Sequence, residues 1–165
     1  TCKLADFGTA RNLTETHSIT GNVGTVAYLP PEGMADKVDA ATQMGGAWDI
    51  YSCAVTLCAI WTQKLPFGEL RDEPIYTAVL VHDKRPDMPA TTPKPSTDSA
   101  SGMTEKTALL TSEAAADTAA TTSFVGEQLG QLVRSMWVRD PQQRPTATHV
   151  IECLRKLLDV LQQQT

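Results

Sequence analysis

The stretch WDIYSCAVTLCAIWTQ (residues 48–63) decides the fold class, because it is apolar on nearly every side. A helix of that kind is buried in a core rather than laid on a surface. The length of the stretch favours a helix over a strand. Its only acidic residue, Asp49, stands near the start, where the helix dipole stabilises a negative charge. The sequence therefore predicts a central buried helix and a mainly α fold.

Further helices are expected on the C-terminal side of this stretch. A helix over residues 73–81 should stop before Pro86, since a proline disfavours helical backbone at the residue before it. Apolar residues recur at helical spacing over residues 126–138 and again from Thr146 onward. The members of these two stripes are Leu129, Val133, Met136 and Trp137, then Val150, Leu154, Leu157, Leu158 and Leu161.

Two segments near the N-terminus are expected to be less regular. KLADFG (residues 3–8) predicts a short strand that runs into a turn. Residues 9–29 hold many Thr, Gly and Asn and have no sustained period, so they predict a long loop.

Residues 89–123 differ in composition from the rest of the chain. Thr, Ser, Ala, Pro and Gly fill most positions, and no aromatic residue occurs. Such a segment buries too little apolar surface to offset its chain entropy, so we expect a disordered or weakly ordered insert between residues 1–88 and 124–165. Within it, residues 104–120 have the Ala, Leu and Glu content of a transient helix. An expanded surface loop is the favoured interpretation, and the Ser/Thr density leaves phosphorylation as an alternative.

Composition argues against several classes of function. The 165 residues fit one domain and have a net charge of −5, without a basic run, which argues against nucleic acid as a main partner. No apolar stretch is long enough to span a membrane. The cysteines form no Cys-x-x-Cys pair, which argues against a metal site or a disulfide framework and favours a reducing, cytoplasmic location. They are Cys2, Cys53, Cys58 and Cys153.

Four motifs in order suggest a family. They are Asp6-Phe7-Gly8, GTVAYLPPE (residues 24–32), WDIYS (residues 48–52) and WVRDPQQRPT (residues 137–146). Together they resemble the C-terminal lobe of eukaryotic protein kinases, from the Asp-Phe-Gly motif to the last helix. One motif alone is weak evidence, whereas four in register around a buried helix are strong evidence. The resemblance implies a segment of a two-lobed α+β kinase fold that uses ATP and Mg²⁺.

The resemblance gives the first motif a role in catalysis and cofactor binding. Asp6 corresponds to the carboxylate that holds Mg²⁺ against the ATP phosphates, where a hard cation neutralises developing charge. Phe7 corresponds to the residue that packs under the regulatory helix of the other lobe. Gly8 would let the backbone move between active and inactive turns.

The second motif resembles the loop that receives the protein substrate. Gly24, Thr25 and Tyr28 are the substrate-docking residues that the resemblance implies. In Ser/Thr kinases a Thr at the position of Thr25 hydrogen-bonds the catalytic loop, so this residue favours Ser/Thr hydroxyls as acceptors. The same motif ends in Pro-Pro-Glu, with Pro30 in place of the commoner Ala.

Three residues have structural roles by the same resemblance. Glu32 and Arg144 would form a buried ion pair that ties the activation segment to the last helices. Asp49 would brace the backbone of the catalytic loop. Asp49 is usually followed by Ser-Phe-Gly, and Ser52-Cys53-Ala54 stands here instead, which implies local repacking.

The activation segment between Asp6 and Glu32 contains candidate phosphorylation sites. A phosphate there could pair with Arg11. The Trp137 pattern resembles that of the tyrosine-kinase and tyrosine-kinase-like groups, and together with Thr25 it points to a tyrosine-kinase-like Ser/Thr kinase. The candidate sites are Thr14, Thr16, Ser18 and Thr20, of which Thr20 is preferred.

Several parts of a kinase are missing from the sequence. It has no catalytic-loop His-Arg-Asp stretch and no Gly-x-Gly-x-x-Gly run, so we expect the catalytic loop and the other lobe to lie in a parent chain. Without them, Leu57, Ile60 and Trp61 or their neighbours should face water. The alternative to an active Ser/Thr kinase is a pseudokinase that acts as a scaffold or allosteric partner. An unrelated helical interaction domain is a third, weaker possibility.

Overall fold

The computed structural model describes Lys3 and residues 5–9, 24–34, 46–68, 70–88 and 108–163. Within these ranges all regular secondary structure is helical. The α-helices are α1 (Ala47–Thr62), α2 (Asp72–Tyr76), α3 (Ala108–Met136) and α4 (Ala147–Gln162). The short 3-10 helices are η1 (Phe7–Thr9), η2 (Val26–Tyr28), η3 (Pro31–Met34) and η5 (Pro141–Gln143), and η4 (Thr77–Val81) is a π-helix. The expectation of a mainly α fold is confirmed for the described residues.

The strand expected over residues 3–8 is not formed by the described part of that stretch. Lys3, Ala5 and Asp6 are irregular, and the chain enters η1 at Phe7. A strand is stable only where a neighbouring strand satisfies its backbone groups. No described segment is a strand that could pair with this one. The apolar pattern of residues 3–8 was therefore not sufficient to form a strand.

Helix α1 matches the predicted central helix to within one residue at each end. It begins after Gly46, whose φ of 82° is a conformation that glycine adopts more easily than other residues. It ends at Gln63, which has a left-handed backbone, as residues that follow a helix often do. One side of α1 is fully buried, but the helix is not buried all round, since Ile60 is 61% exposed. This exposure agrees with the expectation for Ile60, whereas Leu57 and Trp61 are partly buried.

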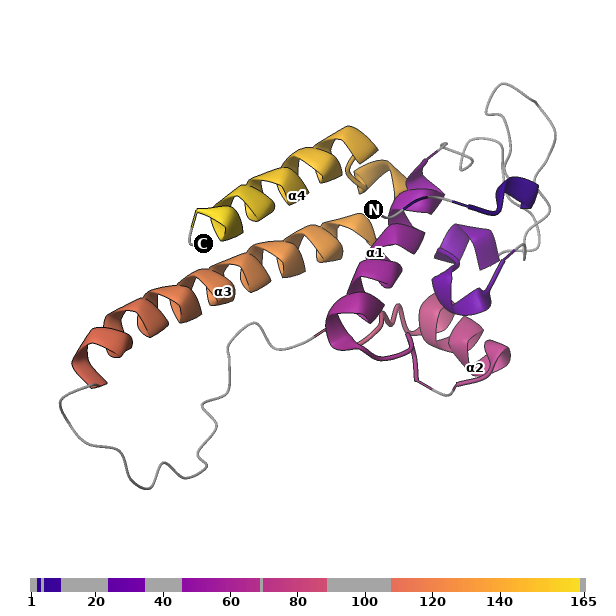
Figure 1. Cartoon of the computed structure of the whole chain (residues 1–165). Helices are drawn as coiled ribbons and strands as arrows, with labels where there is room; N and C mark the ends of the chain where they lie inside the picture. Colours follow the sequence, from indigo (N-terminus) through magenta and orange to yellow (C-terminus); the bar gives the residue numbers. More distant parts are fainter. Residues whose placement is uncertain are drawn as a thin grey trace.

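The main core lies where α1, α3 and α4 meet (Figure 1). In the figure α3 and α4 run side by side, and α1 crosses near the C-terminal end of α3. Each large apolar side chain that is fully buried there contributes about 1.5–3 kcal/mol. The buried members are Ile50, Tyr51, Ala54, Val55, Cys58, Leu132, Val133, Met136, Trp137 and Val150.

A second core lies beside α2. Leu29 and Met34 come from the segment around η2 and η3, and Ile75 and Val79 come from α2 and η4. The helix expected over residues 73–81 is therefore present, but its second half is a π-helix rather than an α-helix. A π-helix inside a short helical segment shifts the register of its carbonyl groups, and such irregularities often occur at functional positions.

Helix α3 begins much earlier than the sequence predicted. The apolar stripe indicated a helix over residues 126–138, whereas the structure has a helix from Ala108. Residues 108–123, which the composition assigns to a disordered or weakly ordered insert, are helical, in agreement with the helical content expected within residues 104–120. Their Ala, Leu and Glu content gives a high intrinsic helix propensity, and a helix propagates easily from a packed neighbour. Residues 89–107 lie outside the described residues.

Helix α4 begins where the sequence predicted. The side chain of Thr146 caps it by accepting a hydrogen bond from the backbone N–H of His149 at 3.3 Å. The apolar stripe of α4 is buried only at its N-terminal end. Val150 is 5% exposed, whereas Leu158 and Leu161 are 53% and 43% exposed.

Candidate functional site

The Asp-Phe-Gly motif forms an exposed turn at the start of η1. The left-handed backbone in this turn belongs to Asp6, with φ 62°, and not to Gly8. An aspartate tolerates this conformation better than most residues. Phe7 is 68% exposed, so it packs against none of the described helices to any great extent.

The carboxylate of Asp6 fits one part of a magnesium site. Mg²⁺ in nucleotide-binding proteins commonly takes one or two carboxylates and completes its shell with phosphate oxygens and water. Asp6 is exposed and supplies one such carboxylate. No cluster of three or more His, Cys, Asp or Glu side chains occurs among the described residues.

The loop that includes Gly24, Thr25 and Tyr28 is a single tight turn. Gly24 has φ 118°, a conformation that a residue with a side chain rarely adopts. The N–H of Tyr28 then donates to the carbonyl of Thr25 at 2.9 Å and closes η2. The turn leaves Thr25 exposed and Tyr28 partly buried, while Leu29 and Pro30 behind it are buried.

Helix α1 holds this loop through Ser52, for which the sequence indicated no contact of its own. The hydroxyl of Ser52 donates a hydrogen bond to the carbonyl of Tyr28 at 3.0 Å. Ser52 lies one turn from the start of α1, on a side that is partly buried. A polar residue within an otherwise apolar helix was the available signal, because such a residue needs a partner when the helix is buried.

The ion pair expected between Glu32 and Arg144 is present in the structure, and it is bidentate. The two terminal nitrogens of Arg144 donate to the two carboxylate oxygens of Glu32 at 2.5 and 2.8 Å. The remaining three N–H groups donate to the carbonyls of Val138, Ala47 and Arg139 at 3.0, 3.0 and 3.2 Å. All five donors of the guanidinium group are therefore satisfied.

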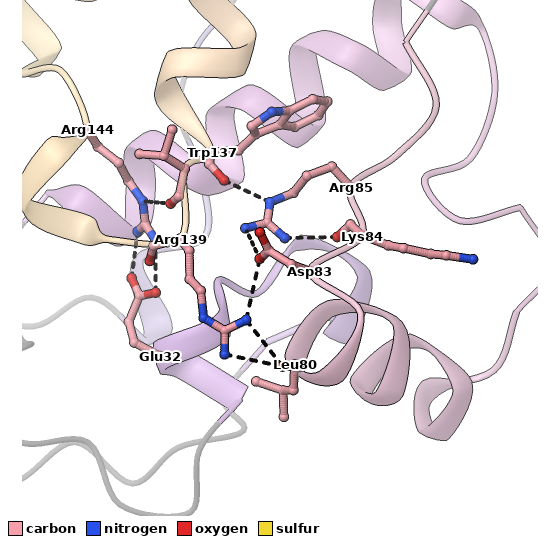
Figure 2. A network of polar contacts seen from close by, with 9 residues as sticks. Glu32, Leu80, Asp83, Lys84, Arg85, Trp137, Arg139 and Arg144 are labelled. Carbon is pink, nitrogen blue, oxygen red and sulfur yellow. Dashed lines mark hydrogen bonds and ion pairs between the residues drawn. The ribbon is translucent and has the colours of Figure 1, made fainter.

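Burial makes this contact structurally important. The Arg144 side chain is 0% exposed and that of Glu32 is 10% exposed. Three segments that are distant in sequence meet at one guanidinium group: η3, the first turn of α1 and the chain that follows α3. Figure 2 shows the pairing of Arg144 with Glu32. Removing one partner of such a pair leaves a buried charge without compensation, which typically costs about 3–5 kcal/mol.

Two arginines lie close to the ring of Tyr51, a member of the main core. The guanidinium carbons of Arg85 and Arg144 lie 5.5 and 5.0 Å from the centre of its ring, within the range of cation–π attraction. The ring is 1% exposed, and its hydroxyl has no hydrogen-bond partner among the described residues. Burial raises the pKa of the Tyr51 hydroxyl, and the two positive charges only partly oppose that rise.

A second polar network connects the end of η4 to the end of α3 (Figure 2). Asp83, with a left-handed φ of 49°, accepts a hydrogen bond from Arg85 at 2.9 Å and faces Arg139 at 3.5 Å. Arg85 also donates to the carbonyl of Trp137 at 2.8 Å. Both terminal nitrogens of Arg139 donate to the carbonyl of Leu80 at 3.2 Å. The sequence did not predict this network, although the run Asp-Lys-Arg-Pro (residues 83–86) contains two of its charged members.

The structure thus joins some of the expected site residues and not others. It brings Glu32 to Arg144 and anchors Tyr28 on α1. Asp6, Thr25 and Asp49 are each exposed, and Asp49 lies in the first turn of α1. The four candidate phosphorylation sites lie outside the described residues; they are Thr14, Thr16, Ser18 and Thr20.

Hydropathy adds one observation about the helices. Among those that the structure describes, none has both the length and the apolar character needed to cross a bilayer.

Comparison with known proteins identifies the family. The model of the protein kinase domain matches residues 1–153. Receptor-interacting serine/threonine-protein kinase 4 of Mus musculus is 29% identical over 149 residues, which are 87% of this chain and 15% of that protein. Serine/threonine-protein kinase STY17 of Arabidopsis thaliana is 28% identical over 159 residues, which are 94% of this chain and 21% of that protein. The chain thus spans about a fifth or less of these relatives, and it belongs to the protein kinase family.

Proposed function

We propose that this chain is part of a Ser/Thr protein kinase that transfers the γ-phosphate of ATP to hydroxyl groups of a protein substrate. The observation that best supports the proposal is the loop that begins at Gly24. It exposes Thr25 while the Ser52 and Arg144 contacts fix the residues behind it. A rigid support for an exposed receiving loop is what phosphoryl transfer needs, because its catalysis depends mainly on positioning and charge stabilisation.

The residues of the chain divide into two roles in this proposal. Asp6 would hold Mg²⁺, which when bound neutralises charge on the phosphate oxygens. Thr25 and Tyr28 would place the acceptor segment of the substrate, and the exposed hydroxyl of Thr25 is free to bond a catalytic loop supplied by the parent chain. Glu32 and Arg144 would hold the loop in place without touching the substrate.

Two finer assignments belong to the same proposal. The names of both relatives include Ser/Thr kinase activity, which supports Ser/Thr specificity, and the Trp137 pattern supports a tyrosine-kinase-like group. A cytoplasmic location is supported by the free thiols of Cys53, Cys58 and Cys153.

The alternative is a pseudokinase scaffold. This alternative is supported by the buried Glu32–Arg144 pair, which holds η3 against the helices. A scaffold would need that contact as much as an enzyme would. Retention of Asp6, Gly8 and Thr25 favours the enzyme, because a scaffold has no chemical need for them.

The test is a phosphotransfer assay on the longer protein that we propose contains this chain. Asp6→Asn should lower the transfer of phosphate from Mg-ATP at least about 100-fold while thermal unfolding stays unchanged. Asp72→Asn is the matched control, since Asp72 is also an exposed carboxylate at the start of a short helix, and it should retain full activity. Undetectable transfer by the unchanged protein would favour the scaffold. Substantial activity of the Asp6→Asn variant would refute the role of Asp6.

A further inference from the structure

The receiving turn, residues 24–29, lies between the two apolar cores of the chain. Its 3-10 helix, η2, contacts both α1 and α2 (Figure 1). Tyr28 packs against the main core, whereas Leu29, the next residue, is buried in the second core with Ile75 and Val79. Two consecutive residues therefore belong to different cores, and the place of the turn depends on how it is attached to each helix.

The two attachments differ in kind. The contact with α2 and η4 is apolar, and the hydrophobic effect that drives such a contact is non-directional. The contact with α1 includes a partly buried hydrogen bond, in which the hydroxyl of Ser52 donates to the carbonyl of Tyr28 at 3.0 Å. A hydrogen bond weakens steeply when its length or angle changes. Ser52 therefore sets where this carbonyl, and the turn that carries it, lies relative to α1.

The segment that follows the turn is held by contacts of its own. The N–H groups of η3 donate to the carbonyl of Pro30, and the ion pair of Glu32 with Arg144 ties η3 to the helices. Neither contact involves Ser52. Loss of the Ser52 hydroxyl should thus loosen the receiving turn and leave η3 in place.

We propose that Ser52 is a positioning residue for protein substrates, because its hydrogen bond to Tyr28 holds the receiving turn in the conformation that binds the acceptor segment. The proposal rests on the proposed function, and Ser52 acts through Tyr28 without touching the substrate. When the bond is absent, the turn has to be ordered as the substrate binds, and this cost weakens substrate binding. Asp6 belongs to another segment, so the affinity for ATP and the rate of transfer in the bound complex should not change.

Steady-state phosphotransfer by the longer protein measures the KM for peptide, the KM for ATP and kcat separately. The acceptor is a mixture of synthetic peptides with a central Ser. Ser52→Ala should raise the KM for peptide about three- to tenfold, as expected for one hydrogen bond, while kcat and the KM for ATP stay the same. Ser52→Thr keeps a hydroxyl on the same carbon and should bring the KM for peptide back to within about twofold of the unchanged protein.

Two controls separate positioning from a general loss of stability. Val150→Ala removes packing from the main core on α4, so it should lower the free energy of unfolding without changing the KM for peptide. Thr56→Ala removes a hydroxyl one turn after Ser52 that bonds the carbonyl of Ser52 within α1, and it should leave the KM for peptide unchanged. If Ser52 had only a structural role, Ser52→Ala would behave like Val150→Ala.

Amide hydrogen exchange tests the hold on the turn without catalysis. The N–H groups of Tyr28 and Leu29 donate to carbonyls within the turn at 2.9 and 3.0 Å, and the N–H of Gly33 donates within η3 at 2.9 Å. Ser52→Ala should speed exchange of the first two at least about threefold and leave Gly33 unchanged.

The outcomes distinguish this proposal from the proposed function. Undetectable transfer by the unchanged protein would refute the proposed function, and exchange would then still decide whether Ser52 holds the turn. An active Ser52→Ala variant with an unchanged KM for peptide, or with unchanged exchange at Tyr28 and Leu29, would overturn the role of Ser52 alone.

Discussion

Replacing Arg144 by Ala should be the most destabilising single change in the described part of the chain. The substitution removes five hydrogen bonds at once and leaves the carboxylate of Glu32, which is 10% exposed, without a counter-charge. It also removes the cation that faces the ring of Tyr51. Loss of one partner of a buried pair predicts a decrease of about 3–5 kcal/mol in the free energy of unfolding. Urea unfolding followed by far-UV circular dichroism measures this quantity.

A series of variants separates charge from geometry. Arg144→Lys keeps the positive charge but has three donors in place of five, so it should lose about 1–3 kcal/mol. The double variant Glu32→Leu/Arg144→Met removes both charges and should recover most of the stability lost in Arg144→Ala. Arg134→Ala, an exposed arginine on α3, is the control and should change stability by less than about 0.5 kcal/mol.

Two outcomes would refute this reasoning. If Arg144→Ala cost less than about 1 kcal/mol, the pair could not be the contact that holds η3 to the helices. If Glu32→Leu/Arg144→Met lost as much stability as Glu32→Leu and Arg144→Met lose separately in sum, the side chains would be acting independently rather than as a pair.

Two further changes test the core around α1. Tyr51→Phe removes a buried hydroxyl that has no partner among the described residues, so unfolding free energy at neutral pH should stay equal or rise slightly. Because folding raises the pKa of this hydroxyl above its ordinary value of 10.0, stability should be complete below pH 10 and fall as pH increases above it. The part of this decrease in unfolding free energy that comes from the Tyr51 hydroxyl should vanish in Tyr51→Phe. Urea unfolding at a series of pH values between 8 and 11 measures it. An identical decrease in both proteins would contradict the role given to Tyr51. Ser52→Ala should cost about 1 kcal/mol because the carbonyl of Tyr28 loses its donor, which the same unfolding assay detects; Thr56→Ala, whose exposed hydroxyl bonds only within α1, is the control.

The sequence by itself determined the features that depend on local pattern. Continuous apolar residues placed α1, and the spacing after Thr146 placed α4, because helix formation follows side-chain periodicity and capping. The family motifs also identified Glu32 and Arg144 as partners, although 112 positions separate them in the sequence. No local pattern could have shown that contact. The order of the four motifs did so only through resemblance to a known fold.

The tertiary structure decided which sides of these elements are buried and which polar groups meet. Val55 and Ile60 are equally apolar residues of one helix, yet Val55 is fully buried and Ile60 is 61% exposed, because only one side of α1 faces α3. Asp83 accepts a hydrogen bond from Arg85 and forms an ion pair with Arg139. These contacts form because the π-helix η4 and the left-handed backbone of Asp83 place this segment beside the end of α3. Burial and such networks arise from contacts between distant segments, and these contacts are set by packing rather than by the propensity of any single stretch.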